Sequence, residues 1–348
     1  MSRKQLAIVA LLGAMAWAGE AHADPVAPYK VTPDMVEAGK KEGTIVFYTA
    51  TDVAVAEKLA AAFEKDYPGI KVQVERAGSE RVFQRIGQEY TTGIHNADVI
   101  ETSDAVHFSV FKKQDWLLQA VPEEVAKDWP ADAKDPDGYF AAYRAHLSVI
   151  AYNKDKIKPE DAPKSFADLL DPKWKGKIVK AHPGYSGTVM TATFVLSQLL
   201  GWEYFEKLGQ QDVMQVQSST EPPKKLAQGE REIEADGNEY NVFRLIDSGV
   251  PLQIVYATEG TPLVVGNAAI LKDAPHPNAA KVFYAFLFSL EAQQLNSDFG
   301  GLRSFHPGVK EKAGRTPLSQ IKLLDSDPDK LEDQIETIKQ KYEQYFGT

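Results

Sequence analysis

The chain has 348 residues, of which 43% are hydrophobic and 25% charged, as in ordinary globular proteins of one large or two medium domains. Its formal net charge of −10 argues against a surface that binds nucleic acid or an anionic membrane. The absence of cysteine excludes disulfides, thiolate metal sites and a cysteine nucleophile. A chain of this length buries enough apolar surface to be stable without disulfides.

The N-terminus has the pattern of a secretory signal peptide. Basic residues at 3–4 precede a short apolar segment at 6–18, and small residues follow at 21–23 where signal peptidase acts. A membrane-spanning helix needs about 20 apolar residues, and Glu20 interrupts this segment too early. We therefore expect cleavage after Ala23 and a mature protein that works outside the cytoplasm.

The first part of the mature chain alternates strands and helices. Apolar residues at helical spacing (Val55, Leu59, Phe63) separate two apolar strand-like segments, and the alternation then repeats. We expect strands at 43–48, 70–75 and 97–100, and helices at 53–67 and 79–90. This order is typical of a doubly wound α/β sheet with helices on both faces.

A second α/β unit follows an irregular, polar stretch at 121–139. Its pattern predicts strands at 145–152, 174–179, 215–220, 232–236, 251–256 and 263–267. It predicts helices starting at 165 and after 188, and at 202–209, 224–229, 279–295 and 327–345, the 279–295 helix being amphipathic. Two such units, with the chain crossing between them more than once, indicate two lobes with a cleft.

One stretch combines a strand, a Gly/Ser-rich turn and a helix. Tyr185, Ser186, Gly187 and Thr188 stand where the first N–H groups of the helix lack internal partners, and the helix dipole there favours negative charge. These residues form a candidate cup for an anion. The alternative is an ordinary N-cap, in which Ser186 or Thr188 only satisfies the first turn.

Polar residues also follow two of the predicted parallel strands, at 49–52 and 101–104. Ligands of open α/β sheets bind beyond the carboxyl ends of the strands, so both segments are candidate site residues by position. The alternative is that they are simply polar surface loops.

These features together resemble the periplasmic solute-binding proteins of ABC importers, in their ferric-ion-binding branch. The resemblance rests on motifs spread over the mature chain: 45–48, 97–99, 171–178, 229–230, 238–240, 274–280 and 286–294. It implies a two-lobed, type II periplasmic binding fold with two doubly wound sheets and a ligand cleft between them. It further implies a periplasmic, monomeric protein without cofactor or catalytic activity, which delivers a small molecule to a membrane permease.

The same resemblance suggests how the chain divides. We expect lobe 1 at 24–143 and again at 258–310, lobe 2 at 144–257, and a C-terminal helical segment at 311–348 that packs on the lobes. Crossings between the lobes are expected near Tyr143–His146 and Tyr256–Glu259.

The chain departs from the ferric pattern at the metal ligands. Ferric binders of this type use an adjacent Tyr-Tyr pair, a His and a carboxylate, because Fe³⁺ prefers phenolate and carboxylate oxygens. Here these positions hold Glu239 and Tyr240, Asp52, and Ser103. The anion-holding positions are kept in Ser186, Gly187 and Thr188, with Ser219 and Asn238 close to further anion contacts.

The sequence therefore predicts a small organic anion, phosphorylated or carboxylated, as the ligand. A ferric site built from Tyr240, Glu239 and Asp52 with a synergistic anion is the alternative. The residues expected to contact the ligand are Thr51, Asp52, Ser103, His146, Tyr185, Ser186, Gly187, Thr188, Ser219, Asn238, Glu239 and Tyr240. Arg244 is a further candidate charge partner, or else a surface residue.

Two other readings of the same sequence are an enzyme and a carrier that serves a chemoreceptor. Enzymes on this scaffold rely on a reactive cysteine, and residues 184–187 are one residue short of a Gly-x-Ser-x-Gly elbow. A chemosensory carrier has no sequence feature that separates it from an importer component.

Overall fold

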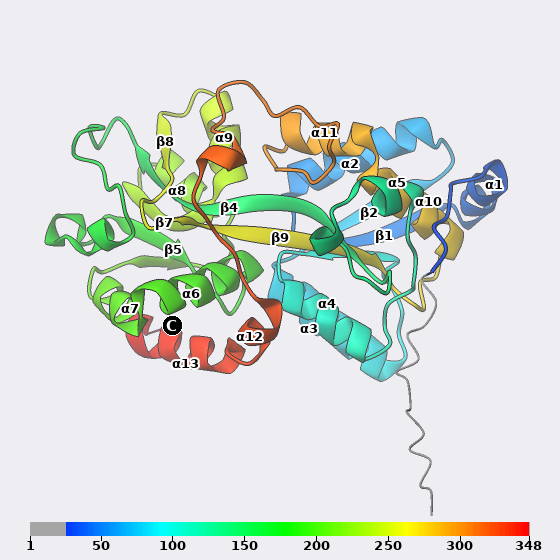
Figure 1. Cartoon of the computed structure of the whole chain (residues 1–348), viewed down its shortest axis with the longest axis horizontal. Coiled ribbons are helices and arrows are strands. Elements are labelled where there is room, and N and C mark those ends of the chain that lie inside the picture. The colour runs from blue at the N-terminus through cyan, green and yellow to red at the C-terminus, as the bar shows by residue number, and fades with distance from the viewer. Residues whose placement is uncertain (1–25, 348) are drawn as a thin grey trace, which may run out of the picture.

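The computed structural model describes residues 26–347, and the predicted signal peptide lies outside this range. Within it, ten strands form a continuous hydrogen-bonded array in the order β2-β1-β3-β9-β4-β7-β5-β6, with β8 paired to β4 and β10 to β9. Helices cover both faces of each half, and the two halves form the lobes of the type II binding fold (Figure 1). The two sheets predicted from the sequence are thus joined edge to edge by shared strands.

The first lobe is built on parallel pairing of β1 with β2 and with β3. Its strands are β1 (Thr44–Thr49), β2 (Lys71–Arg76) and β3 (Val99–Thr102). Its helices are α1 (Pro33–Glu42), α2 (Val53–Asp66), α3 (Ser79–Thr92), α4 (Ala105–Lys113), α5 (Glu123–Asp128), α10 (Pro277–Phe288) and α11 (Leu290–Asp298), with a 3₁₀ turn at Ala131–Ala133.

The second lobe pairs β5 in parallel with β6 and β7. Its strands are β5 (Ile178–Ala181), β6 (Met214–Val216), β7 (Ile233–Asn238), β8 (Leu252–Val255) and β10 (Leu323–Leu324). Its helices are α6 (Gly187–Leu200), α7 (Trp202–Gly209), α8 (Pro222–Ala227), α9 (Glu239–Asp247) and α13 (Ile335–Phe346). Short α12 (Pro328–Glu332) packs beside α4, and 3₁₀ turns lie at Ala167–Leu170, Pro172–Trp174 and Leu318–Gln320.

Two long antiparallel strands, β4 (Ala141–Asn153) and β9 (Thr261–Ile270), connect the lobes. β4 pairs with β9 as far as Leu147 and with β7 from Ser148 onward, so the first crossing falls next to the expected segment 143–146. The second crossing runs along β9, later than expected, because the Thr258 N–H still donates to the Lys164 carbonyl of the second lobe. The lobe boundaries drawn from the sequence stay predictions.

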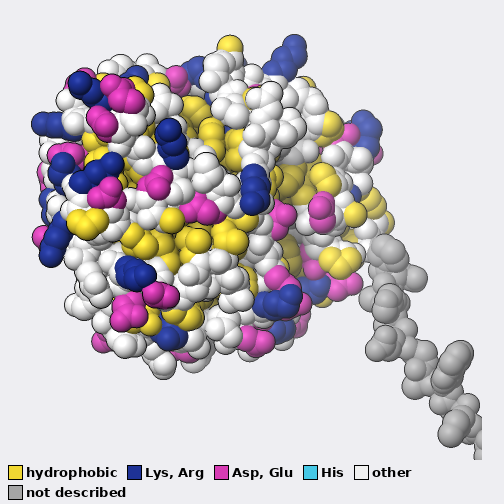
Figure 2. Space-filling view, turned by 60° about the vertical axis from the view of Figure 1, so that its left-hand side comes forward, with side chains coloured by type: hydrophobic (Ala, Val, Ile, Leu, Met, Phe, Trp, Pro, Cys, Tyr) yellow, Lys and Arg dark blue, Asp and Glu magenta, His cyan; other side chains and the backbone are white. Residues whose placement is uncertain are grey.

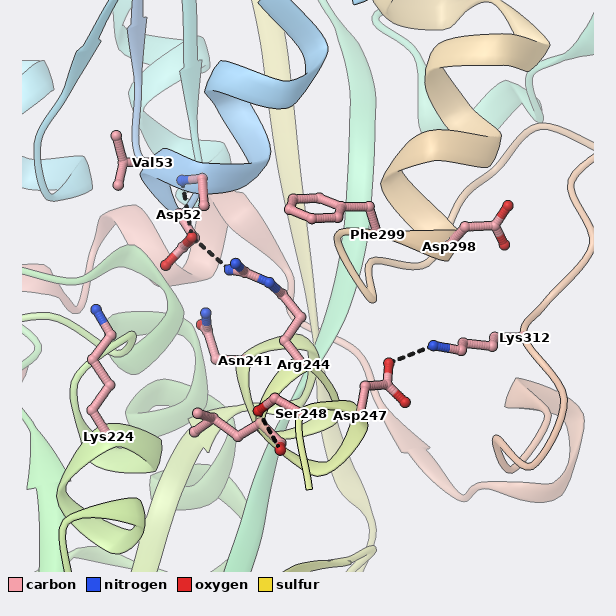
Figure 3. A pocket seen from close by; sticks show the side chains of 12 residues that line it. Asp52, Val53, Lys224, Asn241, Arg244, Asp247, Ser248, Asp298, Phe299 and Lys312 are labelled. Atoms are coloured by element: carbon pink, nitrogen blue, oxygen red, sulfur yellow. Dashed lines mark hydrogen bonds and ion pairs between the residues drawn. The ribbon is translucent and has the colours of Figure 1, made fainter. Parts of the chain in front are cut away.

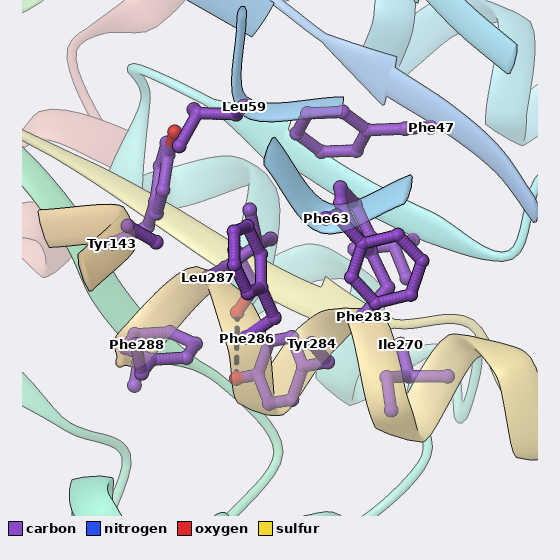
Figure 4. Close-up of a cluster of buried hydrophobic side chains, with 14 of the residues drawn as sticks. Phe47, Leu59, Phe63, Tyr143, Ile270, Phe283, Tyr284, Phe286, Leu287 and Phe288 are labelled. Atoms are coloured by element: carbon purple, nitrogen blue, oxygen red, sulfur yellow. Dashed lines mark hydrogen bonds between the residues drawn. The ribbon is translucent and has the colours of Figure 1, made fainter. Parts of the chain in front are cut away.

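Each lobe has its own apolar core. In the first lobe, the ring of Phe283 on α10 lies 5.2 Å from that of Phe47 on β1 and 5.1 Å from that of Phe63 on α2, both edge-on (Figure 4). A separate cluster around Phe166, Ile178 and Phe205 fills the second lobe. The two lobes are therefore packed around separate apolar clusters.

A smaller apolar cluster joins α4 of the first lobe to α6 of the second. It contains Val106, Met190 and Phe194, and it is completed by Leu331 of α12 and Ile338 of α13. The C-terminal helices therefore contact both lobes on the side of α4 and α6 (Figure 1).

Four points of the sequence-based predictions need correction. The predicted helix 279–295 is two helices, because Ser289 takes an extended conformation and its hydroxyl accepts from the Ala292 N–H as the cap of α11. α10 is buried on most of its surface and is not amphipathic. The tail is also split, into α12 and α13, and the polar stretch 121–139 contains α5.

Candidate functional site

A small polar cavity lies between the lobes, where the carboxyl ends of β1, β2 and β3 face the amino end of α6. Its walls come from both lobes and from β4, and they are lined by Ala50, Arg76, Gly78, Ser79, Ser103, Arg144, Tyr185, Ser186, Thr188, Ser218, Ser219 and Asn238. The cavity measures about 10 Å³, which is room for about one water molecule. The lobes are thus closed on each other at this point.

Two glycines allow this close approach. A methyl group at Gly187 would lie 2.8 Å from the carbonyl of Ser103, and one at Gly78 would lie 2.6 Å from the carbonyl oxygen of Tyr185. Both clashes are with backbone of the opposite lobe, which side-chain movement does not relieve. Glycine at these positions brings the first turn of α6 against the first lobe.

Hydroxyl groups from both lobes meet in the cavity. Ser186 caps α6, its Oγ accepting from the Val189 N–H, and the same Oγ donates to Ser219 Oγ at 3.0 Å. Thr188 Oγ1 donates to Ser103 Oγ across the lobes at 3.4 Å. Hydroxyls can turn to donate to an incoming anion, and the free N–H groups of α6 add to its stabilisation.

Two arginines supply the positive charge. Arg76, at the end of β2, donates from Nη2 to Ser218 Oγ at 2.9 Å, and its buried Nε has no partner. Among residues 26–347 no carboxylate forms an ion pair with Arg76, whereas Arg144 is paired with the buried carboxylate of Glu101 at 2.8 Å. Arg76 is therefore the cavity's uncompensated cation.

His146 lies behind the cavity and fixes the orientation of Thr188. Arg144 can only donate, so His146 Nδ1 accepts from its Nη1 at 2.9 Å. The proton of the neutral ring is then on Nε2, which donates to Thr188 Oγ1 at 3.0 Å. Burial, with the charge of Arg144, holds the pKa of His146 well below its usual value, so the ring is neutral.

The structure brings together half of the residues expected at the site. Ser103, Tyr185, Ser186, Thr188, Ser219 and Asn238 line the cavity, and Gly187 packs at its edge. Tyr185 is 39% exposed and stands at the rim.

Thr51, Asp52, Glu239 and Tyr240, which were also expected to contact the ligand, do not line the cavity. Thr51 donates to Glu101 Oε2 at 2.9 Å, and Asp52 is paired with Arg244 at 2.5 Å. Glu239 is fully buried and paired with Arg303 at 2.7 Å, with Tyr256 donating to it as well. Tyr240 is fully buried, and its hydroxyl has no hydrogen-bond partner.

The residues of the ferric alternative are therefore not assembled in this arrangement. Asp52 and Glu239 each have an arginine partner, which neutralises the carboxylates that a hard cation needs. Burial raises the pKa of Tyr240, which opposes formation of a phenolate. No group of three or more His, Asp or Glu side chains in the described chain is arranged to hold a metal ion.

Sequence reasoning missed four polar residues of the cavity, namely Arg76, Ser79, Arg144 and Ser218. Arg76 and Ser218 each stand at the carboxyl end of a predicted strand, so the positional rule that selected 49–52 and 101–104 applied to them too. Arg144 offered no such signal, because it lies within a strand.

A second, wider pocket is lined by residues from the start of α2, from α9 and from the end of α11 (Figure 3). Its volume is about 640 Å³, and it is lined by Asp52, Val53, Ala54, Lys224, Asn241, Arg244, Leu245, Asp247, Ser248, Asp298, Phe299 and Lys312. Asn238 of the cavity donates to Asn241 Oδ1 of this wide pocket at 3.3 Å. The start of α9 thus contributes one residue to each space.

The face of the molecule seen in Figure 2 has no large basic patch. Basic and acidic side chains are interspersed on the side of the molecule in Figure 2. Of the helices in residues 26–347, none has the length and apolarity to span a bilayer.

Comparison with known proteins agrees with this architecture. The "Iron uptake protein A1" of Synechocystis is 26% identical over 292 residues, covering 77% of this chain and 76% of the relative. The "Major ferric iron-binding protein" of Neisseria meningitidis is 23% identical, covering 80% and 85%.

Solved structures of binding proteins are similar over almost their whole length. The periplasmic binding protein AfuA of Actinobacillus pleuropneumoniae, solved with fructose-6-phosphate, superposes with a TM-score of 0.80 at 26% identity, covering 88% of this chain and 99% of that one. Iron-bound HitA of Pseudomonas aeruginosa has a TM-score of 0.74 at 23% identity, covering 86% and 99%. A family model for "Bacterial extracellular solute-binding protein" matches residues 49–294. The chain belongs to this family of bacterial extracellular solute-binding proteins.

Proposed function

We propose that this protein is the periplasmic binding component of an ABC importer, and that it captures a small organic anion, phosphorylated or carboxylated, between its lobes. A membrane permease then receives the ligand from the monomeric binding protein, and no chemical step takes place on it. A relative from Sinorhizobium fredii, the "Probable ABC transporter periplasmic-binding protein y4fP", is 23% identical over 283 residues and supports this assignment.

One observation carries the choice of an anion. Arg76 points into the interlobe cavity without a carboxylate partner, next to hydroxyls and the amino end of α6. A half-buried cation with only neutral acceptors gains most from a ligand with negative charge. A guanidinium, hydroxyls and helix N–H groups together suit a phosphate or carboxylate.

Binding and closure are coupled in this proposal. Arg76 donates to Ser218 and Thr188 to Ser103, and both hydrogen bonds join the lobes across the cavity. An anionic head entering the cavity takes over these donors and bridges the lobes in their place. Closure then follows from the ligand's higher affinity for the closed arrangement.

The decisive experiment is native mass spectrometry of the protein purified from its periplasm, combined with an absorbance scan. We expect a bound organic phosphate or carboxylate and no tyrosinate–iron band. A coloured protein with one iron per chain would overturn the anion assignment and favour the ferric alternative, which the names of several relatives suggest.

Titration of variants tests the same proposal in solution. Arg76→Gln removes the uncompensated charge and should weaken binding of the identified ligand by about a hundredfold, since hydrogen bonds to charged groups contribute roughly 1.5–3 kcal/mol. Lys207→Gln, on the exposed face of α7, is the matched control and should bind like the wild type.

A further inference from the structure

We infer that the protein has a second small-molecule site, separate from the interlobe cavity, which binds a small organic amine in its protonated form. The site is a pocket of about 320 Å³, here called the β9 pocket, and its lining includes Ser109, Asp132, Thr191, Asn267, Asp325 and Ser326. The inference does not depend on the proposed function, because none of the residues that line the β9 pocket lines the interlobe cavity or the wide pocket.

The walls of the β9 pocket come from both lobes and from a strand that joins them. Ser109 belongs to α4 in the first lobe, Thr191 to α6 in the second, and Asn267 to β9. The segment after β10 forms another side, because β10 pairs with β9 and the chain then runs on to α12 (Figure 1). The volume is at the lower end of the usual range for small-molecule sites, so a small organic molecule has room there.

Polar side chains in this pocket are buried without a hydrogen-bond partner. Asn267 and Thr191 are each 6% exposed, and no hydrogen bond within residues 26–347 involves either side chain. The Ser326 hydroxyl is also buried and has no partner in this part of the chain. Each of the three side chains offers an oxygen that accepts a hydrogen bond, and leaving such groups unsatisfied costs free energy. An occupant that donates hydrogen bonds removes this cost.

The charges of the β9 pocket favour a cation. Asp132 and Asp325 are exposed and form no ion pair with any residue of the described chain. Asp135, a third acidic residue of the lining, is already paired with Lys112 at 2.6 Å. Lys134 also lines the pocket, but its ammonium donates to two carbonyls of α5 at 3.0 Å each. Two unpaired carboxylates thus face one ammonium, so the pocket attracts a cation and repels an anion.

Apolar side chains form much of the remaining wall, and they indicate that the cation carries a hydrocarbon body. Phe140, Leu263, Val265 and Leu331 all line the pocket. A compact, strongly hydrated metal ion gains nothing from such a surface, whereas an alkyl or aryl group is removed from water there. An ammonium group supplies N–H donors for the carboxylates and for the unpartnered oxygens. A protonated amine with an apolar body therefore matches the charge, the acceptors and the apolar wall together.

Isothermal titration with three probes tests the chemical class. Hexylamine and 1-hexanol share a body and differ in charge, and methylamine keeps the ammonium without the body. We expect hexylamine to bind at one site per chain, about tenfold more tightly than either of the others, because two exposed carboxylates each contribute up to about a fivefold gain. Equal affinity for 1-hexanol would overturn the choice of a cation, and a protein that does not bind hexylamine would overturn the site.

Variants locate the binding. Asp132→Asn combined with Asp325→Asn should weaken hexylamine about tenfold and change the affinity for 1-hexanol less than twofold. Asp155→Asn, which neutralises an exposed carboxylate outside the pocket, is the matched control and should bind like the wild type. Ser109→Phe places a ring in the pocket and should abolish binding of both probes. Hexylamine affinity that stays unchanged in both pocket variants would show that the amine binds elsewhere and would overturn the inference.

Failure of this inference and failure of the proposed function look different. Arg76→Gln, in the interlobe cavity, should leave the affinity for hexylamine unchanged, and a loss as large as that in the double aspartate variant would place the amine between the lobes and overturn the inference. The double aspartate variant should in turn leave the affinity for the interlobe ligand unchanged. An iron-loaded protein would overturn the proposed anion and leave the β9 pocket standing.

Discussion

Asp52 and Arg244 join the two lobes at the wide pocket, with Asp52 Oδ1 2.5 Å from Arg244 Nη1. Asp52 also caps α2, so Arg244→Gln is the cleaner way to break the pair. A partly exposed ion pair contributes up to about 1 kcal/mol, so its loss should shift the open–closed equilibrium of the ligand-free protein roughly fivefold toward open. Small-angle scattering should show a larger radius of gyration, and an unchanged radius would mean that other contacts hold the lobes.

Thr188 tests the anion cup directly. Its hydroxyl lies 3.0 Å from His146 Nε2 and 3.4 Å from Ser103 Oγ, and the side chain is almost completely buried. Thr188→Leu replaces this hydroxyl with a larger apolar group, so we expect binding to be abolished. Thr188→Ser keeps the hydroxyl and should retain most of the affinity. Circular dichroism checks that the Thr188→Leu variant is folded. If the folded variant still binds the ligand, the first turn of α6 is not part of the binding site.

His146 should make stability depend on pH. Because burial and the charge of Arg144 lower its pKa well below the usual value, the folded ring stays neutral while the unfolded ring takes up a proton near pH 6.5. Its contribution is thus fully present above pH 6.5 and is lost as the pH falls, by up to about 1.4 kcal/mol per unit.

The matched variant for this prediction is His146→Gln. Glutamine offers one acceptor for Arg144 and one donor for Thr188 but does not titrate in this range. Urea unfolding of both proteins between pH 4.5 and 7.5 should show the wild type losing stability relative to the variant as the pH falls. Parallel curves would show that His146 is protonated in the folded protein.

Local patterns in the sequence were sufficient for most strands and for the hydroxyl-bearing turn that opens α6. Ser186 and Thr188 follow a strand and open a helix, and both signals lie within a few residues of each other. The partners of Glu239 and Asp52 could not be predicted in this way, because Arg303 and Arg244 are 64 and 192 residues away in the chain. From the sequence, both carboxylates are therefore candidates for contact with the ligand, whereas in the structure each is already paired with an arginine.

The same limit explains the missed cations. Arg76 reaches the cavity only because the second lobe brings Ser218, 142 residues away in the chain, to it. Arg144 lies within β4, where the pairing with β9 shifts register between Ala142 and Arg144. A shift of one residue changes the face on which a side chain lies, and an alternating pattern does not reveal it.

Glu239→Gln separates a structural carboxylate from a ligand-binding one. Glu239 is fully buried between Arg303, Arg315 and the Tyr256 hydroxyl. Removing its charge leaves Arg303 with Glu311 alone, and breaking a buried pair typically costs about 3–5 kcal/mol. We expect this loss in urea unfolding, with the ligand affinity of the folded protein unchanged. If the variant is as stable as the wild type but no longer binds the ligand, Glu239 contacts the ligand directly.

Glu234 should act on stability in the direction opposite to His146. It is fully buried in β7, and neither carboxylate oxygen has a hydrogen-bond partner. Burial, with the nearby charge of Asp236, raises the pKa of Glu234 well above its usual value, so the folded protein keeps a proton that the unfolded chain releases near pH 4.3. Its contribution is fully present below pH 4.3 and is lost as the pH rises, by about 1.4 kcal/mol per unit up to the folded pKa.

Glu234→Gln is therefore expected to stabilise the protein at neutral and alkaline pH. The amide has the shape of the protonated acid and cannot ionise, so thermal unfolding should show little difference at pH 4 and a clear gain at pH 8. Asp236→Asn on the same strand is the contrasting control, because it leaves the buried ammonium of Lys180 without its ion-pair partner and should destabilise the protein. A Glu234→Gln protein that is less stable than the wild type at pH 8 would mean that the carboxylate is ionised and paired in the folded state.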